Sequence, residues 1–248
     1  MTYNLIGVGN NAKTIKGDGS EFLTALLYLK PHKTVYKGIT HNLCSMADKA
    51  GCAGPCLYTA GRGVMSNVQA GRLRKTELLF EDRAKFMSLL KTDITVFSRR
   101  TMNNAIQPCV RLDGTSDNQW ERFGIMEQFP ALQFYDYTKI VKRAYKKLPS
   151  NYHITLSYSE ASPEYANEVR QAVDDTGVNM AVVFGVKSAD DFPATFRGLP
   201  VINGDKDDLR FLDPTHCVVG LIAKGKAKKD TSGFVVRPNE DGTWGRLA

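Results

Sequence analysis

The sequence predicts one α/β domain, residues 1–248, built on a parallel sheet that closes fully or partly into a TIM-like (β/α) barrel. Short apolar segments alternate with turn and helical patterns five or six times, which is typical of a parallel sheet with crossover connections. The connections are short, and a single barrel domain often has this length. An open doubly wound sheet is the alternative, but no Gly-x-Gly-x-x-Gly motif follows the first strand.

The first half of the chain contains a lead-in, one strand and one long helix. Residues 1–20 are rich in glycine, asparagine and lysine, and we expect them to be irregular. Residues 22–29 form an apolar run that Lys30-Pro31 terminates, as expected for a buried strand. Residues 64–98 are the longest helical candidate, because apolar side chains recur there at steps of three and four residues.

The second half repeats strand, loop and helix. Six short apolar runs are expected to be strands: residues 109–112, 132–135, 153–157, 178–184, 199–203 and 217–222. Helices are expected at 119–129, in the basic stretch that ends at 147, and at 161–175, where Ser162-Pro163-Glu164 is a helix-start signal. The polar tail, residues 239–248, is expected to be loose.

The composition indicates a globular protein with an anionic partner. Hydrophobic residues make up 42% of the chain and charged residues 24%, which argues against wholesale disorder. No apolar run is long enough to span a membrane and the N-terminus lacks a signal-peptide pattern, so we expect a cytoplasmic protein without membrane contact. The net charge of +7 favours nucleic acid, a nucleotide or another phosphorylated compound as the partner.

Three of the five cysteines, Cys44, Cys52 and Cys56, fall within thirteen residues that also hold glycines and a proline. Such a segment is a loop that can direct three sulfurs to one point, and in a reducing compartment clustered cysteines indicate metal ligands or catalytic groups. Three thiolates can hold a [4Fe–4S] cluster with one iron open. With His41 they could instead form a closed tetrahedral zinc site. The remaining alternative is that they are small buried residues.

Polar side chains follow each expected strand, where the carboxyl ends of parallel strands converge. Asp113, Asp117, Asp136 and Lys139 are the candidates for catalytic groups. Ser116 and Asp205 are candidates for contacts to substrate. The alternative is that these side chains cap helices and turns, which favour aspartate and serine.

A basic run follows the last expected strand, with small residues between its cations. It contains four candidate phosphate ligands, Lys224, Lys226, Lys228 and Lys229, and differs from the Walker A motif. A solvated loop is the alternative. Arg72, Arg74 and Lys75 lie in the long helix and either face solvent or add an anion contact.

Several longer blocks carry a family resemblance. They are residues 51–57 with 60–63, 111–117, 134–139, 209–214 and 225–235. Together they resemble a family of bacteriophage and plasmid proteins, the phage "gene product 88" group, over nearly the full chain. The resemblance implies a protein encoded by a phage or mobile element, and hence a location in the host cytoplasm.

More distantly, three clustered cysteines after a first strand, followed by βα units, are similar to the radical S-adenosylmethionine barrel. The usual Cys-x3-Cys-x2-Cys spacing is absent, since the first gap here is seven residues. This resemblance implies a [4Fe–4S] cluster that uses S-adenosylmethionine.

The sequence therefore supports two main alternative functions. The first is an iron–sulfur barrel enzyme acting on a nucleotide or nucleic acid, with the lysines on phosphate and the cluster performing the difficult step. The second is a zinc-stabilised nucleic-acid-binding protein without catalysis. A metal-free hydrolase or transferase working through Asp113, Asp117 and Asp205 is a third possibility.

Overall fold

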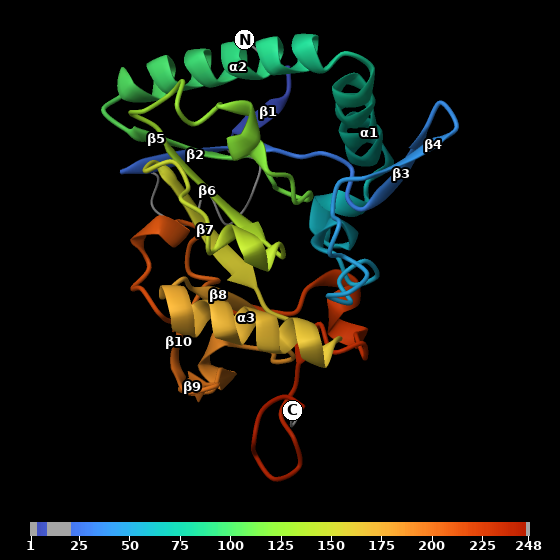
Figure 1. The fold of residues 1–248 in the computed structure, drawn as a ribbon, viewed down its shortest axis with the longest axis vertical. Coiled ribbons are helices and arrows are strands. Elements are labelled where there is room, and N and C mark those ends of the chain that lie inside the picture. Colours follow the sequence, from blue (N-terminus) through green and yellow to red (C-terminus); the bar gives the residue numbers. More distant parts are fainter. Residues whose placement is uncertain (1–3, 9–20, 247–248) are drawn as a thin grey trace.

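The computed structural model describes residues 4–8 and 21–246, and its centre is one ten-stranded mixed sheet (Figure 1). The strand order is β1-β2-β5-β6-β7-β8-β11-β10-β9, and β12 pairs with β8 beside this path. The strands are β1 (Ile6–Val8), β2 (Phe22–Leu27), β5 (Gln107–Arg111), β6 (Gln133–Thr138), β7 (Tyr152–Ser157), β8 (Met180–Phe184), β9 (Thr195–Phe196), β10 (Leu199–Asn203), β11 (Val218–Ile222) and β12 (Val235–Val236). A separate hairpin joins β3 (Lys33–Tyr36) to β4 (Ile39–Asn42).

The prediction of a TIM-like barrel, closed or partial, is wrong. The central strands from β2 to β10 pair in parallel, but β1 and β9 are antiparallel strands at the two edges, and the sheet does not close. The described residues contain only three α-helices. Where helices were expected at 119–129 and before 147, the chain makes the short 3-10 turns η3 (Trp120–Phe123) and η4 (Val141–Arg143). A barrel needs a helix on most crossovers, and these crossovers have none.

The expected long helix is two helices, α1 (Ser66–Glu81) and α2 (Arg83–Met102). Asp82 separates them, because its backbone leaves the helical region and its side chain accepts the Lys85 N–H as the N-cap of α2. The expected helix at 161–175 is confirmed as α3 (Pro163–Thr176). Ser162 caps its first turn, and Gly177 ends it in the left-handed conformation at φ 70°.

Two apolar clusters hold the helices to the sheet. Phe86 and Ile94 of α2 pack with Val110 of β5 and Phe134 of β6. The α3 side chains pack on β7, β8 and β11 in the second cluster, which also contains Cys52. The first cluster positions the carboxyl ends of β2, β5 and β6, and the second those of β7, β8 and β11.

The segment after β10 covers the sheet face that displays the polar residues of β5 and β6. Its Phe211 ring lies 5.4 Å from both the Phe22 and the Tyr135 rings. Asp208 of the same segment forms a buried ion pair with Arg111 at the end of β5. This segment therefore packs on the sheet face where the interior side chains of a barrel would lie.

Residues 237–243 are exposed, and the chain returns to the domain at residues 244–246. Trp244 lies edge-to-face on Phe184 with ring centroids 5.3 Å apart, and the Arg246 N–H donates to the buried Glu160 carboxylate at 2.6 Å. None of the helices in the described ranges has the length and apolar character needed to cross a membrane.

Candidate functional site

The cysteine loop lies across the carboxyl ends of several parallel strands. Cys44 Sγ accepts a hydrogen bond from the His32 N–H at 3.4 Å and donates to the Thr115 carbonyl, beyond β5, at 3.8 Å. The Ser159 hydroxyl, beyond β7, donates to the Ala50 carbonyl at 2.7 Å. Cys52 packs into the apolar cluster under α3. The loop is thus held by backbone and side-chain contacts from β5 and β7 at once.

Gly51 allows this close seating. It has φ +63°, and a Cβ at this position would lie 2.5 Å from Ala161 Cβ and 2.8 Å from Ser232 Oγ. Both features favour glycine, since other residues avoid positive φ and have no room here. The nearby Gly54 has open space around it.

Lys139, which follows β6, interacts electrostatically with the three cysteines of the loop. Burial lowers the pKa of the Lys139 ammonium, but Cys52, Asp117, Cys56 and Cys44, which become negative on ionisation, raise it by more, so the net shift is upward. Its Nζ also lies 5.8 Å from the centroid of the Phe234 ring. One partly buried ammonium therefore lies within electrostatic range of all three cysteines.

The thiols themselves are poorly solvated. Burial raises the pKa of Cys44 to about 12, with Asp117 and Cys56 adding to the shift and Lys139 opposing it. Burial also raises the pKa of Cys52. Without a bound metal these groups are neutral thiols at pH 7, whereas coordination to metal deprotonates a thiol.

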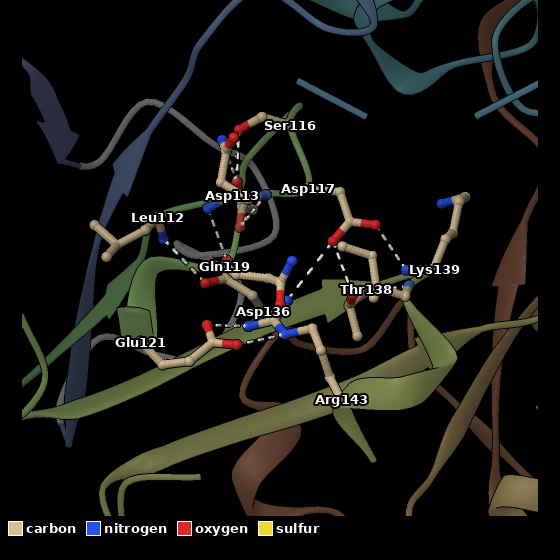
Figure 2. Close-up of polar contacts among 12 residues, drawn as sticks. Leu112, Asp113, Ser116, Asp117, Gln119, Glu121, Asp136, Thr138, Lys139 and Arg143 are labelled. Atoms are coloured by element: carbon tan, nitrogen blue, oxygen red, sulfur yellow. Dashed lines mark hydrogen bonds and ion pairs between the residues drawn. The ribbon is translucent and has the colours of Figure 1, made fainter. Parts of the chain in front are cut away.

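Asp117 fastens the start of the cysteine loop to the end of β6 (Figure 2). Its carboxylate accepts hydrogen bonds from the Thr138 hydroxyl at 2.7 Å and the Lys139 N–H at 2.8 Å. Its own N–H donates to the Leu43 carbonyl at 2.8 Å, directly before Cys44. Burial raises the pKa of Asp117, and the Lys139 N–H and ammonium oppose that shift.

Asp113 and Asp136 are fully buried and shape the loop after β5 (Figure 2). Asp136 accepts the Asp113 N–H at 2.8 Å, and Asp113 accepts the Ser116 hydroxyl at 2.6 Å and the Asn118 N–H at 3.1 Å. Burial raises the pKa of both carboxyls, that of Asp136 to about 6, and their mutual repulsion adds to the shift of Asp113. The Asp136 carboxyl thus binds the backbone of the loop after β5, and the Asp113 carboxyl binds the Ser116 hydroxyl and the backbone of the same loop.

Arg143 is a buried partner of this network that sequence reasoning did not single out. Its guanidinium makes two hydrogen bonds to Glu121, at 3.1 and 2.9 Å, and one to the Tyr152 hydroxyl at 2.7 Å (Figure 2). Nη1 lies 3.7 Å from Asp117. The basic stretch around it was expected to form a helix, and only the fold shows that this arginine is buried.

The lysine turn, η7 (Gly225–Lys229), lies beside the third cysteine. The Lys226 N–H donates to the Thr59 hydroxyl at 3.3 Å, and that hydroxyl donates to the Cys56 carbonyl at 2.8 Å. The side chains of Lys226, Lys228 and Lys229 are exposed. Lys224 differs, because its ammonium pairs with Asp205 at 2.6 Å, and Asp205 also accepts the Ile222 N–H.

His41 lies on β4, outside this gathering. Its ring stacks on Phe80 of α1 with centroids 3.9 Å apart, and the charges that act on Cys44 and Cys52 in the described chain do not include it. Over the described ranges, no three His, Cys, Asp or Glu side chains stand in an arrangement that could hold a single metal ion. Cys109 and Cys217 are buried in the core, as expected.

The fold and site define an α/β protein with a mixed, mainly parallel sheet and a cysteine–lysine cluster at its carboxyl edge. Residues 4–238 match a family model described as Gene product 88. The chain therefore belongs to the Gene product 88 family of phage proteins. No curated protein and no solved structure matches the chain. These comparisons do not show a similarity to radical S-adenosylmethionine enzymes.

Proposed function

We propose that this protein is an iron–sulfur enzyme that holds a [4Fe–4S] cluster on Cys44, Cys52 and Cys56 and acts on a nucleotide or nucleic-acid substrate. The observation that carries the proposal is that the loop bearing the three cysteines is tied by hydrogen bonds to residues beyond the carboxyl ends of β5 and β7, at the edge of the sheet. In open α/β sheets this edge is where ligands bind.

The donor set suits a cluster. Three thiolates with a cuboidal cluster form an anionic centre, and Lys139 supplies a fixed positive charge beside it. A cluster held by three cysteines keeps one iron open for a ligand such as S-adenosylmethionine, and it would supply one-electron chemistry when bound. This is the feature that the site would share with radical S-adenosylmethionine enzymes.

A single zinc ion suits the same residues less well. Thiolates on one zinc ion each bind at about 2.3 Å, so their sulfurs must lie within about 4 Å of one another. The described side chains form no such group, and His41 stacks on Phe80 instead.

The remaining predicted site residues line the cluster, position its loop, or bind phosphate in this proposal. Asp117 and Lys139 line the cluster side of the site and orient its thiols, while Asp113, Asp136 and Ser116 are positioning residues that hold the loop carrying Asp117. Lys226, Lys228 and Lys229 are exposed next to Cys56 and can meet phosphate groups. Asp205 orients Lys224 at the base of that turn.

Metal and sulfide analysis of the anaerobically reconstituted full chain tests the proposal. We expect about four irons and four sulfides per chain, with visible charge-transfer absorption. Replacing Cys44, Cys52 and Cys56 together by serine should abolish both, while the matched control Cys109→Ser, a buried core thiol of β5, should retain them. Stoichiometric zinc without sulfide would overturn the proposal in favour of a zinc-stabilised nucleic-acid-binding protein.

A further inference from the structure

Arg72 of α1 is a deeply buried arginine that has no carboxylate partner among residues 4–8 and 21–246. Its side chain is 7% exposed, and Nε and Nη1 have no hydrogen-bond partner in the described chain. Its guanidinium carbon lies 5.1 Å from the centroid of the Tyr28 ring. Burial lowers the pKa of the Arg72 guanidinium, and Tyr28 and Cys56 oppose this shift.

The other buried arginines behave differently. Arg111 pairs with Asp208, Arg143 with Glu121, and Arg210 with Asp213 at 3.1 Å. Taking a guanidinium out of water is costly unless an anion compensates it. No described residue gives Arg72 such a partner, which is the expected condition of a group that receives its counter-ion from a ligand.

The surroundings of Arg72 belong to the cysteine site. The guanidinium of Arg72 lies over the Tyr28 ring. This ring packs against the loop after β5, since a Cβ on Gly114 would lie 2.6 Å from two Tyr28 ring atoms. Gln69, one turn before Arg72 on α1, donates a hydrogen bond to the Gly63 carbonyl, in the segment that follows Cys56. The turn after Cys56 contacts the lysine turn, because a Cβ on Gly225 would lie 2.8 Å from the Thr59 carbonyl oxygen.

We propose that Arg72 binds a phosphate group of the substrate beside Cys56. The unpaired guanidinium donates hydrogen bonds to the phosphate oxygens, Tyr28 supports it from below, and the exposed lysines of η7 attract further negative charge. Phosphate rather than carboxylate fits this surface because the lysine turn adds several cations to the same region. The inference rests on the proposed function for the identity of the substrate, but phosphate binding itself requires no cluster.

Calorimetric titration of the full chain, without bound iron, with inorganic phosphate tests this assignment. Arg72→Gln should weaken phosphate binding by about tenfold or more, since a charge-assisted hydrogen bond is lost. The matched control Arg74→Gln, an exposed arginine of the same helix, should leave it unchanged. Arg72→Gln should also unfold at a higher temperature than the wild type in phosphate-free buffer, because a buried unpaired charge is removed.

Two results would overturn the assignment: phosphate affinity of Arg72→Gln within about twofold of the wild type, or acetate binding the wild type as tightly as phosphate. Iron content separates this inference from the proposed function. A chain that loses phosphate binding with Arg72→Gln but takes up no iron refutes the cluster and leaves the phosphate site standing.

Discussion

Replacing Asp117 should loosen the attachment between the cysteine loop and β6. Asp117→Ala removes the acceptor for the Thr138 hydroxyl and the Lys139 N–H, at 2.7 and 2.8 Å. Each charge-assisted hydrogen bond contributes about 1.5–3 kcal/mol, or about 3–6 kcal/mol together. Removing a carboxylate whose burial raises its pKa gives part of this back. The expected net loss in the free energy of unfolding is about 2–4 kcal/mol.

Urea unfolding of the full chain measures this loss. Asp117→Asn keeps one acceptor oxygen and should lose about half as much as the alanine variant. The matched control Asp174→Ala, at an exposed position on α3, should change stability by less than about 0.5 kcal/mol. The reasoning is refuted if Asp117→Ala loses less than about 1 kcal/mol, or if asparagine costs as much as alanine.

Three further outcomes follow from the same geometry. Burial raises the pKa of Asp136 to about 6. The contribution of Asp136 to stability should therefore be complete below about pH 4 and decline as the pH rises through 6. Asp136→Asn should flatten this decline when unfolding is measured as a function of pH. Gly51→Ala should destabilise the chain by about 1–3 kcal/mol while Gly54→Ala does not, so equal unfolding midpoints would contradict the close seating of the loop. His41→Ala should leave the iron content of reconstituted protein unchanged; a loss of metal would make it a ligand.

The sequence was sufficient to predict the parallel strands and the three-cysteine loop after the first of them. Apolar runs such as 178–184 predict strands well, because both faces of a central parallel strand are buried. The crossovers were harder. Trp120, Ile125 and Met126 pack into the core from a 3-10 turn and its loop, so tertiary contacts override a weak local preference for helix there.

Polar partners were the least predictable part of the site. Aspartates after strands were expected, but the sequence does not tell which of them, like Asp113 and Asp136, turn inward to bind backbone N–H groups. The sequence does not tell that Arg72 is buried and its neighbour Arg74 exposed, because only the packing of α1 on Tyr28 distinguishes them. The sheet edges were equally hidden, because antiparallel β9 is two residues long.

Electron paramagnetic resonance of the reconstituted and reduced chain tests the central claim most directly. The account predicts the signal of a reduced [4Fe–4S] cluster that changes when S-adenosylmethionine is added, because only three cysteines, Cys44, Cys52 and Cys56, hold the cluster and one iron is open. A chain that gives no cluster signal and carries one zinc ion instead would contradict it.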